Sequence, residues 1–416
     1  MAATIADLPY WEVEFDREGS IVSDGGLLAE AAGNGVRDLF VFSHGWNNSF
    51  AGARSLYRDM FSMVAGMLSP EQRATTGLVG VLWPSLLFPE DGPAGNGGPP
   101  PGRSSGAALA AALAPAFPDR REQVTALGDL LDAQPQEGAA LERFHALAAG
   151  LVSTPGSGGP EDNGEHFALV ADARTAIGES AGTPGAGGGD AQGFDFFATM
   201  WHGARELLRT MSYYEMKNRA GLIGRRGLGR LLADLQERNG QVRAHLLGHS
   251  FGARLVAFAL SGLPATATGQ ASPVKSLLLI QGAFSHFAFS PGKPGALAPV
   301  ADRVDGPLVA TYSVHDRAVG LWYPNASRLA RQNNQGLDDF NFEWGGMGHD
   351  GYQHEGVVAR PLAAAGDRYD WQSGRFYRLD SSAVIRRNLS AFSEAHSDIG
   401  HPEVAWAAVS AAGLGR

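Results

Sequence analysis

A serine between two glycines lies in the stretch Gly248-His249-Ser250-Phe251-Gly252. Residues 242–247, just before it, are predominantly apolar and β-prone, which favours a short buried strand. Residues 251–263 form a longer apolar run in which Arg254 is the single charge, and this favours a buried helix. A G-x-S-x-G pattern between a strand and a helix is typical of a nucleophilic serine on a sharp turn. The chemistry that it predicts is attack of Ser250 Oγ on an acyl carbonyl.

The glycines of this pattern have a physical reason. The turn is strained, and neighbouring backbone passes too close to Gly248 and Gly252 for a Cβ atom. Ser250 would then lie at a helix N-terminus, where the helix dipole favours developing negative charge. The same pattern also arises by chance in a chain with 56 glycines. A nucleophile therefore needs further support from a base, a residue that orients the base, and donors for an oxyanion.

Candidate oxyanion donors follow an earlier predicted strand, residues 36–43, in the turn Ser43-His44-Gly45-Trp46-Asn47-Asn48. In one interpretation, the glycine of this turn lets the amide of Trp46 point into the site. The amide of Phe251, next to the nucleophile, would be the second donor. In the other interpretation, this is an ordinary strand-to-helix turn and His44 is a hydrogen-bonded structural residue.

The two motifs, HGWNNSF and LLGHSFGARLV, each follow a predicted strand, and together they resemble the α/β-hydrolase superfamily. The core looks most like the lipase- and esterase-type bacterial members. The resemblance covers roughly residues 9–85 and 195–412. It implies an α/β-hydrolase fold and a serine esterase activity that needs no cofactor. It also implies a catalytic triad in the chain order nucleophile, acid, histidine.

The resemblance places the acid after a strand beyond the nucleophile. Residues 307–314 predict such a strand, and His315-Asp316 follows it at the carboxyl edge of the sheet. Asp316 is therefore the candidate acid, whereas Asp302 and Asp305 precede the strand and lie at the wrong edge. The alternative is a surface aspartate that caps the next helix or pairs with the arginine beside it.

The family's histidine lies on a loop between the last strand and the closing helix. His396 fits this position, because it follows the predicted strand 375–379 and precedes the predicted helix 403–412. His349 is the alternative base, although it lies in a glycine-rich loop before the last strand. His401 adjoins the closing helix and is expected in its cap region.

The remaining histidines have structural interpretations. His249 is the variable residue of the elbow and is expected to pack or hydrogen-bond beneath the turn. His349 and His354 are five residues apart, one too many for a metal pair on one helix face, and no third ligand is apparent. We therefore expect no metal and no cofactor. Three further histidines line a substrate pocket or are structural: His202, His286 and His315.

The elements that must position these residues alternate along the chain. Such alternation predicts a mostly parallel sheet with helices on both faces. We expect strands at 9–16 (a half-buried edge strand), 36–43, 78–83, 242–247, 276–281, 307–314 and 375–379. We expect helices at 50–68 with Ser49 as N-cap, 196–217, 227–238, 251–263, and 403–412 with Pro402 at its first position.

The composition changes between residues 86 and 193, where Gly/Pro-rich stretches alternate with Ala/Leu-rich pieces such as 107–114 and 122–132. We predict that this segment is a cap or lid with short helices, inserted into a core formed by 1–85 and 194–416. Residues 86–200 hold 15 of the 43 acidic residues but 5 of the 33 basic ones, so the rest of the chain carries 28 of each. An acidic lid disfavours strongly anionic substrates.

Composition also narrows the function class. The absence of cysteine excludes disulfides and thiol catalysis, and the net charge of −10 shows no basic nucleic-acid footprint. With no signal-peptide pattern and no apolar run of about 18 residues, a cytoplasmic protein is expected. The resemblance to α/β hydrolases implies that its substrate is a small-molecule acyl ester. Two other functions remain open: acyl transfer by the same triad, and partner binding on an inactive hydrolase scaffold.

Overall fold

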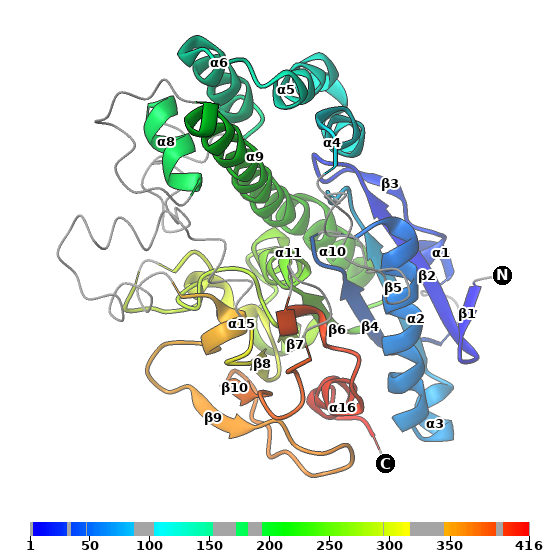
Figure 1. Ribbon diagram of the computed structural model, residues 1–416. Coiled ribbons are helices and arrows are strands. Elements are labelled where there is room, and N and C mark those ends of the chain that lie inside the picture. The colour runs from blue at the N-terminus through cyan, green and yellow to red at the C-terminus, as the bar shows by residue number, and fades with distance from the viewer. Residues whose placement is uncertain are drawn as a thin grey trace.

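The apolar strands of the chain assemble into one ten-stranded sheet in the computed structural model (Figure 1). The structure describes residues 3–30, 35–46, 48–86, 104–152, 172–181, 194–293, 295–316, 345–387 and 394–415. The strands are β1 (Ala3–Ile5), β2 (Leu8–Phe15), β3 (Ile21–Ser23), β4 (Asp38–Ser43), β5 (Thr76–Leu82), β6 (Arg243–His249), β7 (Val274–Ile280), β8 (Leu308–Tyr312), β9 (Val358–Pro361) and β10 (Phe376–Asp380).

The sheet is mostly parallel, as predicted, and its strand order is β1-β2-β5-β4-β6-β7-β8-β10-β9. Strands β1 and β3 pair antiparallel with β2, and the other pairs are parallel. The expectation that residues 9–16 form an edge strand is wrong, because β1 and β3 both pair with β2 on its outer side. These two strands have three residues each, too few to show alternation in the sequence.

The strand order reverses at the centre of the sheet. From β4 the chain goes to β5 on one side, and it then returns to form β6 on the other side of β4. Ser43, the last residue of β4, pairs in register with Gly248 near the end of β6. The two turns that carry the sequence motifs therefore leave neighbouring strands at the same edge. In open α/β sheets, ligands bind at such a switch point.

Helices cover both faces of the sheet (Figure 1). Helices α2 (Phe50–Met67) and α16 (Pro402–Ala411) share one apolar cluster with the strands, and α9 (Phe194–Ile223), α10 (Gly229–Arg238) and α11 (Phe251–Ala259) share the other. The predicted caps are confirmed. Ser49 Oγ accepts a hydrogen bond from the amide of Gly52 at 3.1 Å, and Pro402 is the first residue of α16. Short helices α1 (Leu27–Glu30), α3 (Pro70–Arg73) and α15 (Met347–Asp350) lie in connections.

The two helices expected at 196–217 and 227–238 are one continuous element. Helix α9 passes through a π-helical stretch, Gly224–Leu228, directly into α10. Glycines in and after the π-helical stretch allow close packing. A Cβ on Gly224 would lie 2.2 Å from the carbonyl oxygen of Leu255 in α11, and one on Gly229 would lie 2.4 Å from that of Ala259. Glycine thus allows the backbones of these helices to approach each other.

Within residues 104–152 and 172–181, the structure describes four further α-helices: α4 (Gly106–Leu113), α5 (Arg121–Ala133), α6 (Gly138–Ala149) and α8 (Ala173–Ser180). The predictions at 107–114 and 122–132 match α4 and α5. These helices cluster around the amino-terminal part of α9, beyond the sheet (Figure 1). In this cluster, the Phe144 and Trp201 rings pack edge to face, with centroids 5.7 Å apart. Buried Arg219 of α9 donates to the carbonyl oxygens of Pro84, after β5, and Ala116, after α4, and so joins the cluster to the sheet.

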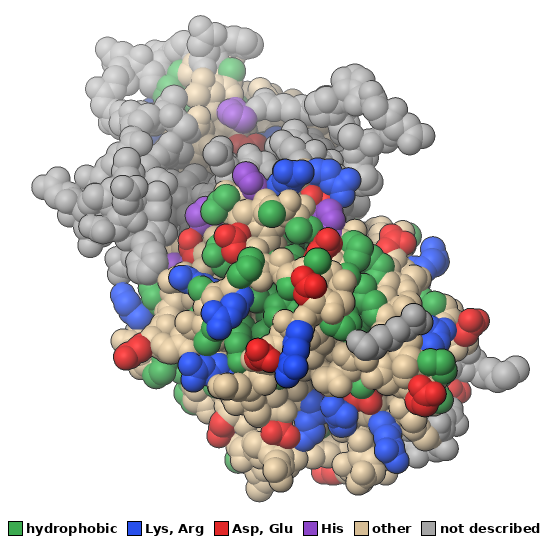
Figure 2. Space-filling view, turned by 90° about the horizontal axis from the view of Figure 1, so that it is seen from below, with side chains coloured by type: hydrophobic (Ala, Val, Ile, Leu, Met, Phe, Trp, Pro, Cys, Tyr) green, Lys and Arg blue, Asp and Glu red, His purple; other side chains and the backbone are tan. Residues whose placement is uncertain are grey.

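The surface seen from below the view of Figure 1 carries both charge signs. Acidic and basic side chains are interspersed over the described part of this face (Figure 2). This distribution agrees with the equal numbers of acidic and basic residues outside 86–200. Among the described helices, none combines the length and the apolar character needed to cross a bilayer.

Candidate functional site

Ser250 lies on a strained turn between β6 and α11. Its backbone has φ +58° and ψ −121°, and a non-glycine residue in such a conformation costs about 1–3 kcal/mol. A Cβ on Gly248 would lie 2.3 Å from the oxygen of Gly252. A Cβ on Gly252 would lie 2.1 Å from the oxygen of Ser43. Both glycines are therefore required by close backbone approach, as the sequence predicted.

The turn after β4 lies against this elbow. A Cβ on Gly45 would lie 2.6 Å from Ser250 Cβ, so the turn that holds Trp46 adjoins the serine. Phe251 is the first residue of α11, and the first amides of a helix have no acceptor within it. The rings of Trp46 and Phe251 pack with centroids 6.2 Å apart. Both residues with candidate oxyanion donors thus lie at the carboxyl edge of the sheet.

His44 holds this turn in place. Its Nδ1–H donates to the Gly45 carbonyl oxygen at 2.8 Å, and its carbonyl oxygen accepts from Trp83 Nε1–H at 3.1 Å. Its ring also stacks on Trp83, with centroids 5.4 Å apart. Burial lowers the pKa of His44 to about 4, so the side chain is neutral near pH 7. These contacts give His44 the structural role that was one of the two interpretations of this motif.

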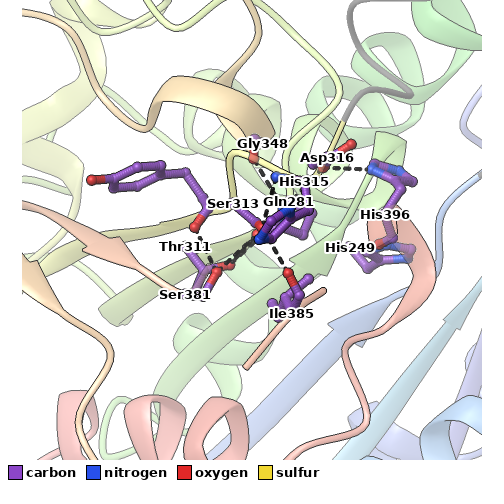
Figure 3. Close-up of polar contacts among 11 residues, drawn as sticks. His249, Gln281, Thr311, Ser313, His315, Asp316, Gly348, Ser381, Ile385 and His396 are labelled. Carbon is purple, nitrogen blue, oxygen red and sulfur yellow. Dashed lines mark hydrogen bonds and ion pairs between the residues drawn. The ribbon is translucent and has the colours of Figure 1, made fainter. Parts of the chain in front are cut away.

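Asp316 and His396 meet although 80 residues separate them (Figure 3). Asp316 follows β8 and is completely buried, and His396 is 8% exposed on a short 3-10 turn, Glu394–Ser397, before α16. His396 Nδ1–H donates to Asp316 Oδ2 at 2.8 Å. A neutral imidazole that donates through Nδ1 keeps a lone pair on Nε2, where it can accept a proton. The structure thus brings together the candidate acid and the candidate base.

His249 joins this pair to the elbow. Its Nε2–H donates to the carbonyl oxygen of His396 at 2.9 Å, and the centroids of the two imidazole rings are 4.9 Å apart (Figure 3). Because His249 directly precedes Ser250, this hydrogen bond holds the histidine loop against the nucleophile turn. Burial, with a smaller effect from His396, lowers the pKa of His249 to about 3. Among the described residues, Ser250 Oγ makes no hydrogen bond to His396; such bonds often form only when substrate is bound.

The alternative base, His349, is paired with a different carboxylate. Its Nδ1 lies 2.7 Å from Asp350 Oδ1, and His286 Nδ1 lies 3.0 Å from Asp350 Oδ2. Burial alone would raise the pKa of Asp350, but the hydrogen bonds from both histidines outweigh it and lower the pKa to about 2. The His349 side chain is 46% exposed at the end of α15. The structure therefore favours His396 as the partner of Asp316.

Two other histidines have structural positions. His401 is the N-cap residue of α16 and its Nε2 lies 2.9 Å from Asp398 Oδ1, near the helix end where it was expected. His245 Nε2 lies 3.0 Å from Asp38 Oδ1 inside the sheet, and burial lowers its pKa. The Asp38–His245 pair lies towards the amino ends of β4 and β6, away from Ser250.

Asp305 precedes β8, and its Oδ2 accepts a hydrogen bond from Lys275 Nζ at 2.8 Å.

Two residues at the site had no motif to reveal them. Tyr213 of α9 packs its ring on Phe251 at 4.7 Å and on Trp46 at 5.7 Å, so α9 covers both candidate oxyanion residues. Gln281 follows β7, and its Nε2–H donates to Asp316 Oδ2 at 2.9 Å. In the sequence, Gln281 was taken as the last residue of the predicted strand 276–281, whereas β7 ends one residue earlier, at Ile280.

Among the described residues, no group of three or more histidine or carboxylate side chains is arranged to hold a metal ion. Comparisons of the chain with protein families, with curated proteins and with solved structures found no match. The arrangement of the described residues themselves is therefore the basis for any functional conclusion.

Proposed function

We propose that the protein is a serine hydrolase with an α/β-hydrolase fold that cleaves a carboxylic ester or a related acyl bond. The observation that carries this proposal is the buried Asp316–His396 hydrogen bond, held by His249 against the strained Ser250 turn. A strained turn with a short strand before it and a helix after it is how a nucleophilic serine is presented. The chain order Ser250, Asp316, His396 is that of the family.

The mechanism assigned to these residues follows triad logic. His396 Nε2 takes the proton of Ser250 Oγ as the oxygen attacks the acyl carbon. Asp316 accepts from Nδ1–H throughout, and its charge stabilises the imidazolium that forms. The amides of Trp46 and Phe251 donate to the oxyanion. The imidazolium then protonates the leaving group, and the neutral imidazole activates water, which releases the acid from Ser250. No cofactor enters this mechanism.

The helices between β5 and α9 are assigned as the cap over this site. The support for this assignment is α9, which extends from the helical cluster to the sheet and packs Tyr213 on Trp46 and Phe251. Tyr213 and Phe251 are buried and Trp46 is partly exposed, so a substrate bound at Ser250 would contact the Trp46 ring that they hold in place. Aromatic side chains suit an apolar acyl or alcohol group, because they remove a large area from water. We therefore expect an ester with an apolar part.

The test is labelling by a fluorophosphonate probe, with the labelled peptide located by mass spectrometry. Wild-type protein should be labelled at Ser250, and Ser250→Ala and His396→Ala should not be labelled although both remain folded. His349→Ala is the matched control and should be labelled at the wild-type rate. If His349→Ala abolishes labelling and His396→Ala does not, the base is His349. No labelling of folded wild type would refute the proposal and favour a binding protein.

A further inference from the structure

Gln281 occupies an unusual position directly after β7. It is completely buried, and its backbone has φ +46°, in the left-handed region that residues other than glycine rarely adopt. Its backbone amide donates to Thr311 Oγ1 at 3.3 Å. A buried, unfavourable backbone conformation persists only where the surrounding structure imposes it, and such positions concentrate at functional sites.

The side-chain amide of Gln281 is fully hydrogen-bonded (Figure 3). Nε2–H groups donate to Asp316 Oδ2 at 2.9 Å and to the Gly348 carbonyl oxygen at 3.0 Å. Oε1 accepts from Thr311 Oγ1 at 3.1 Å, and Ser381 Oγ lies 3.4 Å away, although the Ser381 proton has a closer acceptor, the Tyr312 carbonyl oxygen at 2.6 Å. A carboxylate and a backbone carbonyl are acceptors only, so the NH₂ group must face Asp316 and Gly348. The orientation of the amide is thus fixed.

Asp316 depends on this amide because it has few other partners. Oδ2 receives two donors, Gln281 Nε2–H and His396 Nδ1–H, whereas Oδ1 has no hydrogen-bond partner among the described residues. A buried carboxylate is costly unless hydrogen bonds compensate its charge. Of the two hydrogen bonds that the described residues donate to the Asp316 carboxylate, Gln281 supplies one. It also fixes which oxygen of Asp316 faces His396.

We propose that Gln281 is a positioning residue for the triad: it holds the Asp316 carboxylate in the rotamer that orients His396. This inference rests on the proposed function, because it gives the Asp316–His396 pair a catalytic purpose. Gly348 supports the same arrangement. A Cβ there would lie 2.7 Å from Asp316 Oδ2, so glycine lets α15 bring its carbonyl oxygen to the Gln281 amide.

A purely structural role is the competing explanation. Through Thr311 and Ser381, Gln281 also joins the carboxyl ends of β7, β8 and β10, and any substitution can loosen this junction. The variants must therefore separate the hydrogen bond to Asp316 from the hydrogen bonds at the other end of the amide. Thr311→Val is the matched control, since it removes partners of Gln281 and leaves the contact with Asp316 intact.

The decisive variant is Gln281→Glu, which keeps the size of the side chain and places a second carboxyl group against Asp316. Two carboxylates in contact cannot both ionise freely, so a proton is held between them at neutral pH. Other ionisable groups near Asp316 are His396, His249, which burial keeps neutral, His315 on the same loop, and Asp350 with its histidines on α15. Because Asp316 must be ionised to stabilise the imidazolium, hydrolysis requires that this pair lose its shared proton. We therefore expect the acid limb of the pH profile of ester hydrolysis to move up by about one pH unit. Thr311→Val should lower Tm and leave that limb where it is in wild type.

Gln281→Leu provides a second measurement. We expect kcat to fall about 10- to 100-fold with little change in KM, because one hydrogen bond to a charged group is lost and substrate contacts are not. The downfield NMR signal of the His396 Nδ1 proton should shift in this variant and remain unchanged in Thr311→Val. If Gln281→Glu does not fold, the signal in Gln281→Leu still tests whether Gln281 positions the Asp316–His396 pair.

The outcomes distinguish this inference from the proposed function. Absence of fluorophosphonate labelling at Ser250 in wild type would overturn both. Labelling of wild type, together with a Gln281→Glu acid limb that coincides with that of wild type, would overturn the role of Gln281 alone. An Nδ1 proton signal in Gln281→Leu identical to that of wild type would do the same. If the His396 Nδ1 proton signal shifts as much in Thr311→Val as in Gln281→Leu, the role of Gln281 is structural.

Discussion

Replacement of Asp316 by asparagine removes a charge from the site with little change in shape. Asp316 Oδ2 faces two donors, Gln281 Nε2–H and His396 Nδ1–H, so the asparagine oxygen would take this position. Its NH₂ group would replace Oδ1, which has no hydrogen-bond partner among the described residues. The hydrogen bonds and the imidazole tautomer are therefore expected to remain. The charge that stabilises the imidazolium is lost.

The size of the effect follows from the geometry. The donor and acceptor atoms are 2.8 Å apart, and both side chains are buried. Two unit charges centred about 4 Å apart interact by about 4 kcal/mol at an effective dielectric constant of about 20. Since about 1.4 kcal/mol corresponds to a tenfold change in rate, we expect kcat/KM to fall about a thousandfold.

Stability should change in the opposite direction. In wild type, one oxygen of the buried Asp316 carboxylate has no hydrogen-bond partner in the described part of the chain, which is costly, and asparagine removes the charge. We expect Asp316→Asn to have a Tm equal to or above that of wild type. Asp316→Ala leaves both donors without an acceptor, and we expect it to lose about 1–3 kcal/mol of stability as well as activity.

The assay is hydrolysis of a neutral chromogenic ester, measured beside thermal unfolding of the same three proteins. A loss of activity in Asp316→Asn without a loss of Tm would support the charge argument. If folded Asp316→Asn retains more than about a tenth of the wild-type kcat/KM, the Asp316 charge does not serve catalysis and the acid assignment is wrong.

Three other predictions concern the elbow, the buried histidines and the cap. Gly252→Ala should destabilise the fold and abolish labelling, because its Cβ would lie 2.1 Å from the oxygen of Ser43. The control Gly66→Ala, at an exposed helical position with nothing within 4 Å, should be neutral or up to about 1 kcal/mol stabilising in urea unfolding. Below pH 6.5 the unfolded chain protonates His44 and His249 while the fold keeps their pKa values at about 4 and about 3, so stability should fall on acidification. The loss is about 4 kcal/mol between pH 7 and pH 5, and a urea midpoint that does not change over this range would contradict it. Finally, kcat/KM should be higher for neutral esters than for otherwise matched anionic ones, and a preference for anionic esters would disprove the role of an acidic cap.

The central strands β4 to β8 were predictable because they are predominantly apolar, as a strand buried on both faces requires. The predictions at 36–43, 78–83, 276–281, 307–314 and 375–379 differ from the observed strands by at most two residues at either end. The short strand β9 was not predicted, because its four residues carry no periodic signal. The sequence also did not indicate that α9 continues into α10. Glycine has the same appearance in a sequence whether it ends a helix or permits close packing.

The serine turn could be recognised from local sequence, but its partners could not be settled in the same way. The described residues make Asp–His contacts at Asp316–His396, Asp350–His349, Asp350–His286, Asp398–His401 and Asp38–His245. Each pair looks equally plausible from residue types alone. What separates them is which pair the topology brings to the elbow, and only long-range packing determines that.

The distribution of backbone strain points to the same place as the topology. Among the described non-glycine residues, positive φ occurs at Ala6, Asp7, Gln134, Ser250 and Gln281. Ala6 and Asp7 form the tight turn between β1 and β2, and Gln134 ends α5, so these three have ordinary local causes. Ser250 and Gln281 instead follow the neighbouring buried strands β6 and β7. Strain of about 1–3 kcal/mol at each of two adjacent strand ends is hard to explain by turn formation alone. It is explained if one conformation presents the nucleophile and the other holds the carboxylate that orients its base.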